Sequence, residues 1–270
     1  LSFLRMSSLF SRFSRRLASS ASALVKRERF YKEVNVVTET TAGVPQYKIA
    51  LDGRVVKTMG GKPLQMGSEP LAMAIAEEWA SQEKHIEQGH MRLSGLAMTA
   101  IDNPLHMTKE SITATIMEYL ATDTVLFFAP ENEALMEAQK SFWVPLIDAT
   151  NQEMNTKLQP ALDFVAEPVS PEDRRKFESW LMSYNFWALT GLQYAVQSSK
   201  SVLVPHGMIK HRLGAREAVE LALLEQRVQA KQWGEVEWAH TMDEEELCTR
   251  LTSGVLFAYL NSNQFITKTL

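Results

Sequence analysis

Two stretches early in the chain alternate apolar and polar residues with a period of two. They are VNVVT at residues 34–38 and YKIAL at residues 47–51, and each has the pattern of a strand with one buried face. Asp52 and Gly53 follow the second stretch and precede RVVKT. An Asp-Gly pair is typical of a two-residue type I′ turn, because both central residues need a positive φ. The pattern therefore predicts a hairpin sheet.

Helical periodicity follows this sheet. Ser68 is a candidate N-cap, and residues 92–103 and 108–120 predict two further helices. The apolar stripe of the first helix comprises Leu71, Ile75, Trp79 and, less regularly, Ile86. Its spacing makes Trp79 a packing residue, whose replacement should cost several kcal/mol of stability, on the scale of large-to-small core changes. VLFFA at residues 125–129 predicts a buried strand before Pro130.

The second half of the chain has helical spacing throughout. Residues 131–154 and 215–233 predict long helices, and Ser170–Asp173 has the cap, proline and acids of a helix start. Asp243 is expected to cap the last helix, whose inward residues would be Leu247, Leu251, Val255 and Leu256. Several helices with short connections favour a bundle.

These patterns define an α+β protein with two domains. A small α+β domain with a hairpin sheet is expected over residues 28–130, and an all-α helical bundle over residues 131–270. A length of 270 residues allows one large domain or two ordinary ones.

Residues 1–27 differ from the rest in charge. They hold six basic residues, eight serines and no acid, and helical spacing separates the basic residues from an apolar face. This composition is typical of a mitochondrial or plastid transit peptide, which the import machinery would bind; a basic tail for an anionic surface is the alternative. Because the chain opens with Leu1, Met6 is a candidate initiator. Without this segment 22 basic and 32 acidic residues remain, a net charge of −10.

Composition and motifs exclude several functions. The net charge of −4 argues against a general nucleic-acid binder, and no apolar run reaches the roughly 18–20 residues that span a bilayer. Cys248, as a single cysteine, can form neither an internal disulfide nor a multi-cysteine zinc site. No phosphate-binding, dinucleotide-binding, zinc-protease or nucleophile-elbow motif is present. We therefore predict no catalytic residue, cofactor or metal, and no stable membrane insertion; an enzyme using Asp102, Asp123 and a histidine is the alternative.

The string QWGEVEWAH, around residue 237, is a candidate binding edge. It places Glu235 and Glu237 between Trp233 and Trp238, where two helices are expected to join. Tryptophans beside carboxylates on a connecting segment are typical of an interaction surface. Spacing alone favours equally an arrangement in which the tryptophans fold inward and the acids are solvated.

Several longer strings resemble one protein family, in its order and at compatible spacing over roughly residues 29–260. They are RFYKEV, IALDGRVVKT, AIAEEWASQ, LAMTAIDNP, EYLATDT, SYNFWALTGL and KQWGEVEWAH. The chain thus resembles the assembly-factor family of the mitochondrial ATP synthase, in particular the chaperone for the alpha subunit of the catalytic head. This resemblance implies an N-terminal α+β domain, a C-terminal orthogonal helical bundle, a place in the mitochondrial matrix and no enzymatic activity.

The resemblance also implies a client and a surface. The chaperone would cover the beta-facing surface of free alpha subunit until the beta subunit displaces it. The client-binding candidates are Glu225, Glu237, Trp238 and His240. Thr241 departs from the family pattern, in which an acid often follows EWAH. A general matrix holdase and a structural subunit of the finished synthase are the alternatives.

Overall fold

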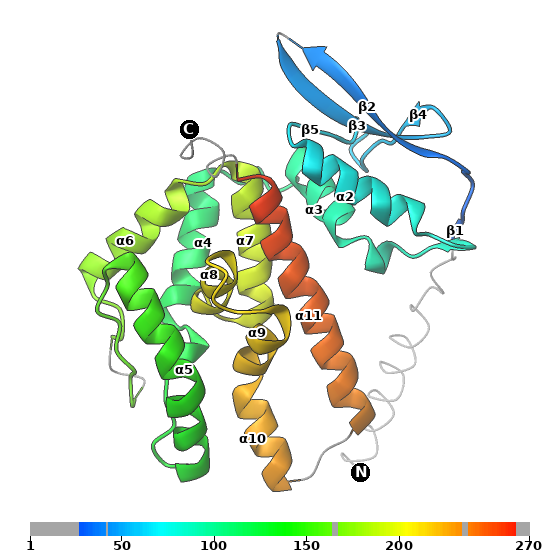
Figure 1. Cartoon of the computed structure of the whole chain (residues 1–270). Helices are drawn as coiled ribbons and strands as arrows, with labels where there is room; N and C mark the ends of the chain where they lie inside the picture. The colour runs from blue at the N-terminus through cyan, green and yellow to red at the C-terminus, as the bar shows by residue number, and fades with distance from the viewer. Residues whose placement is uncertain (1–26, 42, 164–166, 234–236, 263–270) are drawn as a thin grey trace, which may run out of the picture.

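The chain begins with short strands and ends in a set of packed helices (Figure 1). The computed structural model describes residues 27–41, 43–163, 167–233 and 237–262. The strands are β1 (Arg27–Glu28), β2 (Val34–Thr41), β3 (Val44–Leu51), β4 (Arg54–Val55), β5 (Gln65–Met66) and β6 (His85–Ile86). With the helices that follow, they confirm the predicted α+β class.

The hairpin sheet is built around β3. β2 pairs with β3 in antiparallel register from Val34↔Leu51 to Thr41↔Val44, while β4 and β5 both pair with the opposite side of β3. Between β3 and β4, Asp52 (φ 47°) and Gly53 (φ 78°) adopt the positive φ values that the two-residue turn requires. The register therefore leaves β2 at one edge of the sheet.

Two helices complete the N-terminal core. They are α2 (Glu69–Ala80) and α3 (Arg92–Asp102), and the Ser68 hydroxyl caps α2 by accepting from the N–H of Leu71. Trp79 is buried in this core, and its carbonyl accepts a 2.7 Å hydrogen bond from the Tyr31 hydroxyl. The first strands are thereby fixed to the C-terminal end of α2.

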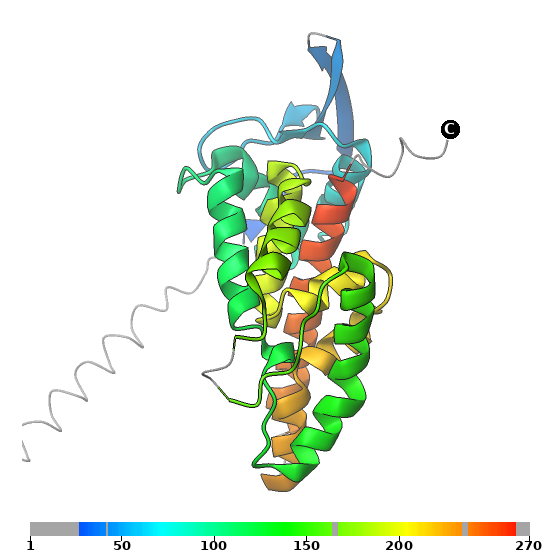
Figure 2. The same ribbon diagram turned by 90° about the vertical axis from the view of Figure 1, so that its left-hand side faces the viewer.

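The remaining helices form a second core (Figures 1 and 2). They are α4 (Lys109–Ala121), α5 (Glu133–Met154), α6 (Pro171–Met182), α7 (Phe186–Ser199), α8 (Leu203–Ile209), α9 (Ala215–Ala222), α10 (Leu224–Trp233) and α11 (Glu237–Leu260). Two short 3₁₀ turns, η1 (Gln88–His90) and η2 (Thr124–Leu126), lie between elements. None of the helices in the described ranges combines the length and the apolar character that crossing a membrane requires.

Helices α7 and α11 cross with their main chains in contact. A Cβ built on Gly254 would lie 2.7 Å from the carbonyl oxygen of Gly191, and one built on Gly191 would lie 2.6 Å from that of Gly254. No real Cβ tolerates such distances, so glycine at both positions is what permits this approach.

The two cores meet at the ends of these two helices. Phe257 of α11 belongs to the N-terminal core, and its ring stacks on Trp187 of α7 with centroids 5.9 Å apart. The Ser68 hydroxyl also donates to the carbonyl of Leu260. The division between the cores falls between α3 and α4, whereas the domain boundary at residue 130 stays a prediction.

Local capping overrides two of the predicted elements in the first half. The predicted strand at residues 125–129 forms only in part: the Asp123 carboxylate accepts from the N–H of Val125 and starts the 3₁₀ turn η2 there, and Phe127 then makes an isolated parallel bridge with Ala161. The first helix ends at Ala80, and Ile86 lies in β6. Ser81 and Gln82 side chains donate to the carbonyl of Glu78, which ends the helix before the predicted stripe is complete.

Three corrections concern the second half. The region 215–233 is two helices, α9 and α10, separated at Leu223. Asp243 does not cap the last helix, since α11 begins six residues earlier at Glu237. Leu256 is 44% exposed because it lies about 200° around α11 from Gly254, the residue that faces α7. Leu251 and Val255 are buried as predicted.

Candidate functional site

Helix α11 presents one face to the bundle and the opposite face to solvent. Four of its exposed residues fall within about 60° of the helix circumference at 100° per residue. We call these four residues, Met242, Glu245, Thr249 and Leu256, the α11 stripe. Met242 is 64% exposed and Leu256 44% exposed, so large apolar side chains mark both ends of this stripe. This makes the stripe the candidate interaction surface of α11.

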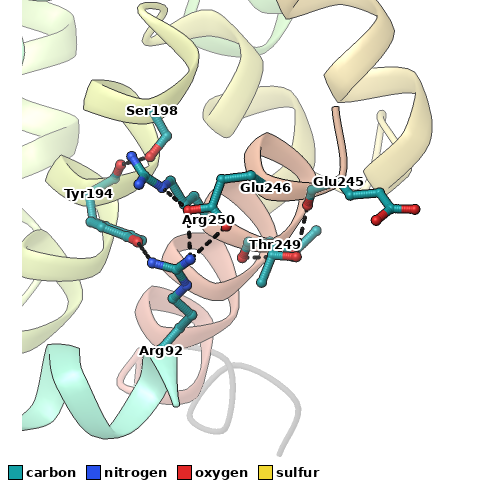
Figure 3. Close-up of polar contacts among 8 residues, drawn as sticks. Arg92, Tyr194, Ser198, Glu245, Glu246, Thr249 and Arg250 are labelled. Carbon is teal, nitrogen blue, oxygen red and sulfur yellow. Dashed lines mark hydrogen bonds and ion pairs between the residues drawn. The ribbon is translucent and has the colours of Figure 1, made fainter. Parts of the chain in front are cut away.

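A cluster of charged groups fixes α11 against the N-terminal core (Figure 3). The guanidinium of Arg92, on α3, donates to both carboxylate oxygens of Glu246 at 2.6 and 2.7 Å and to the Tyr194 hydroxyl at 3.3 Å. Arg250 donates to the same carboxylate from one turn further along α11. Burial alone would raise the pKa of Glu246, but the bonds from Arg250 and Arg92 outweigh it and lower that pKa. Figure 3 shows Glu245 directed away from this cluster.

Beside the cluster, α3 and α7 border a groove of about 320 Å³. Its lining combines amide, hydroxyl and apolar side chains, including Gln88, Thr99, Gln193, Tyr194 and Gln197. Gly95 of α3 is exposed in this lining, and a Cβ built on it would meet no atom within 4 Å. Glycine inside a helix costs roughly 0.5–1 kcal/mol relative to alanine. No contact among the described residues therefore explains the glycine, whereas close approach of a partner chain would.

Glu225, the first client-binding candidate, lies at the contact of α10 with α5. It is half-buried, and its carboxylate accepts a 3.1 Å hydrogen bond from the Gln139 amide. Burial raises the pKa of Glu225, and the bond from Gln139 opposes that shift. The geometry gives Glu225 a role in joining the two helices; its contact with a client stays a prediction.

The other three candidates come at the start of α11. The backbone positions of Glu237, Trp238 and His240 lie in the first turn of that helix, while the connection from α10 (residues 234–236) and all three side chains lie outside the described residues. The structure thus places the three candidates on the same helix as the α11 stripe. It does not bring Glu225 into the stripe.

The sequence missed Arg92, Gly95, Glu246 and the α11 stripe. The sequence does contain a signal for the stripe: Met242 and Leu256 are fourteen residues apart, which is nearly four helical turns. That signal was lost because the last helix was expected to begin at Asp243.

The two carboxylates of the alternative enzyme reading serve structure at separate places. Asp102 accepts from the Thr58 hydroxyl at 2.6 Å and the Gly60 N–H at 2.9 Å, and these bonds lower its pKa. Asp123 is fully buried at the start of α8, where it accepts from the N–H of Val202 at 2.6 Å. Burial raises the pKa of Asp123 to about 6 despite its hydrogen bonds. Asp102 and Asp123 therefore do not form the carboxylate pair that the alternative, an enzyme, would require.

His206 is buried among aromatic rings. The Trp180 ring lies edge-on to it at 5.0 Å, and neither imidazole nitrogen has a hydrogen-bond partner among the described residues. Burial, with a smaller effect from Lys210, lowers the pKa of His206 to about 4. Within the described ranges, no group of three or more potential ligands is placed to hold a metal ion.

Comparison with known proteins agrees with this fold. Residues 28–151 match the sequence profile of a family described as ATP12 chaperone protein. Protein atp12, mitochondrial, of Schizosaccharomyces pombe is 31% identical over 242 residues, which cover 85% of this chain and 81% of that protein. Protein ATP12, mitochondrial, of Saccharomyces cerevisiae is 24% identical over 277 residues, covering 86% of this chain and 84% of that protein.

A solved structure extends the agreement to three dimensions. The crystal structure of Atp12 from Paracoccus denitrificans matches with a TM-score of 0.76 at 28% identity, over 87% of this chain and 99% of that one. The fold and the sequence therefore define a chaperone. The chain belongs to the ATP12 chaperone family.

These relatives bear on two sequence-based predictions. The resemblance to an assembly-chaperone family is confirmed. The mitochondrial localisation that the family resemblance implied is confirmed by the two relatives, both named as mitochondrial proteins. Residues 1–26 themselves lie outside the described residues.

Proposed function

We propose that this protein is an assembly chaperone that binds the free alpha subunit of the catalytic head of the mitochondrial ATP synthase. In the matrix it shields the beta-facing surface of alpha and is displaced when the beta subunit arrives. The observation that carries the proposal is the α11 stripe, which leaves the large apolar side chains of Met242 and Leu256 exposed on the solvent-facing side of one helix. Membership of the ATP12 chaperone family supports it.

The physical reason for such a chaperone lies in the client. Permanent subunit interfaces are large and apolar, and a free subunit that exposes one aggregates. A methionine such as Met242 suits this task because its unbranched side chain adapts to irregular surfaces. The affinity of the chaperone for alpha then comes from the surface buried between them. The beta subunit displaces the chaperone because it buries the same surface of alpha more completely.

The stripe is held rigid, which favours binding. The glycine contact with α7 and the Arg92–Glu246 pair fix α11 from two sides. A surface already in its bound shape loses less conformational entropy on association. Trp238 stands four residues before Met242, one helical turn, so the first turn of α11 would extend the stripe. By the same spacing Glu237 and His240 fall about 110° and 170° around α11 from the middle of the stripe, so their contact with the client would be separate from it.

An aggregation assay tests this function. Alpha subunit is diluted from denaturant with and without residues 28–270 of the chaperone, light scattering is followed, and beta subunit serves as control client. We expect suppression for alpha alone, at near-stoichiometric ratio and without ATP. Equal protection of both subunits would indicate a general holdase, and no protection of either would contradict the proposal. Copurification with the finished synthase would instead indicate a retained subunit.

Variants locate the surface. Met242→Ser combined with Leu256→Ser should weaken suppression, as should charge reversal at Glu237. Leu162→Ser is the matched control, because Leu162 is comparably exposed but lies between α5 and α6. Equal activity of the stripe variant and the control would exclude the α11 stripe as the client surface while leaving the chaperone function standing.

A further inference from the structure

Strand β2 has a main-chain edge that the fold does not use. The amide of Ile49 on β3 donates to Leu64, and its carbonyl accepts from Val56, so the main-chain groups of Ile49 face away from β2. Because these directions alternate along a strand, Ala50, Lys48 and Gln46 face β2 and pair there with Asn35, Val37 and Glu39.

The alternate residues of β2 therefore point outward. In the outer half of β2 these are Val36, Thr38 and Thr40, whose N–H and C=O groups have no hydrogen-bond partner within the described part of the chain. The Asp52 N–H also donates to the Glu33 carbonyl. Asp52 is two residues from Ala50 and Glu33 two residues from Asn35, so this bond independently supports which main-chain groups of β2 face β3. Three consecutive outward positions are enough to pair with an added strand.

The outer half of this hairpin also stands clear of the helices. Figures 1 and 2 show β2 and β3 extending past α2, and the N-terminal core ends along the hairpin at Val36 and Tyr47. β2 has few of the features that normally protect an edge: it contains no proline and no lysine, its one charged residue, Glu39, is ion-paired with Lys48 of β3, and its sequence VNVVTETT is rich in β-formers.

We infer that the outward edge of β2 binds an extended segment of the client chain by strand addition. This inference rests on the proposed chaperone function and adds a second contact to the α11 stripe. Main-chain groups recognise any extended backbone, so the edge can hold a segment that is still unpaired in the free client. Glu39, the single charged residue of β2, is already ion-paired with Lys48 of β3, so the side chains of β2 add little charge preference and the main-chain groups carry the recognition.

Charge disfavours a second copy of this chain as the occupant. Outside residues 1–27 the chain holds 22 basic and 32 acidic residues, so two copies carry the same net charge and repel each other. The β2 strands offer no opposite charges to offset this repulsion, because Glu39 is already ion-paired with Lys48 of β3. A client segment carries no such constraint.

A proline on the edge tests the proposal without breaking the hairpin. Thr38→Pro removes one outward N–H and no bond to β3, and proline is tolerated at edge positions. Thr38→Val keeps the N–H and is the matched control, and Thr40→Pro is a second edge variant nearer the tip. With full-length chain and refolding alpha subunit, we expect both proline variants to bind roughly tenfold more weakly, the scale of one strong hydrogen bond lost, and the valine variant to bind as wild type.

Amide hydrogen exchange by NMR supplies the direct readout. In the free protein the amides of Val37 and Glu39 should be protected and those of Val36, Thr38 and Thr40 should exchange fast. Addition of alpha subunit should protect the second set. Unchanged exchange there while alpha is still kept soluble overturns strand addition and leaves the chaperone function intact. Protection that grows with chaperone concentration alone would assign the edge to a second copy, and failure of wild type to protect alpha would reject the underlying function.

Discussion

The α7–α11 contact and the outer half of the β2–β3 hairpin use their main chains in opposite ways. At Gly191 and Gly254 two helix backbones touch so closely that no side chain fits between them. Along β2 the groups of Val36, Thr38 and Thr40 find no partner within the described part of the chain. A chaperone of this kind needs both: a scaffold whose packing is complete, and surfaces whose packing is completed by a client.

The N-terminal core that anchors the hairpin should be the most sensitive to truncation. Trp79 is buried, lies edge-on to Tyr31 at 5.8 Å and closes the end of α2. Trp79→Ala is expected to lower the free energy of unfolding by about 3–5 kcal/mol. Urea unfolding followed by circular dichroism measures this. Trp79→Phe should lose clearly less, and equal losses for both would show that ring volume is not what the core requires.

The scaffold itself is tested by adding one methyl group. Gly254→Ala places a Cβ against the carbonyl of Gly191 and should cost about 1–3 kcal/mol, even though alanine favours the helix by about 1 kcal/mol. Thermal unfolding of this variant and of Gly191→Ala should give similar losses, because each methyl meets the same crossing. A stable Gly254→Ala variant would mean that the helices do not touch as described.

Stability of the helical core should fall as the pH is lowered through the titration of His206. Its pKa drops from an ordinary value near 6.5 to about 4 in the folded protein, so folding favours the neutral ring. This contribution is complete above pH 6.5 and declines as the pH falls, with about 2 kcal/mol lost by pH 5. The difference in unfolding free energy between wild type and His206→Leu should shift by that amount between pH 7.5 and 5. A constant difference would mean that His206 is not desolvated.

The Arg92–Glu246 ion pair joins α3 of the N-terminal core to α11. A double-mutant cycle with Arg92→Met and Glu246→Gln should give a coupling energy of about 0.5–1 kcal/mol, because Glu246 is partly exposed and screened. Raised salt should reduce the coupling. Zero coupling in a denaturant cycle would show that this ion pair does not help to join the two cores.

The smallest effect has the opposite sign. Gly95→Ala enters open space on α3 and should stabilise the free protein by about 0.5–1 kcal/mol. If the groove beside α7 receives client, the same methyl should weaken binding of alpha subunit. Stabilisation with unchanged binding would remove the groove from the client surface and leave Gly95 unexplained.

The elements that the sequence predicted well are those with a local signal. The period-two stretches gave β2 and β3, Asp52 and Gly53 gave the turn, and Ser68 and Ser170 gave helix starts, because strands, turns and caps depend on neighbours within a few residues. The start of α11 was misplaced because Asp243 carries a cap signal that helical residues on both sides override.

The sequence by itself determined the α+β class, the family and the mitochondrial address. Only the tertiary structure decided which surfaces remain free. The closeness of Gly191 to Gly254, the ion pair of Arg92 with Glu246 and the outward edge of β2 all join or separate residues far apart in the chain. Periodicity states which residues share a face of an element, but only packing settles what that face meets.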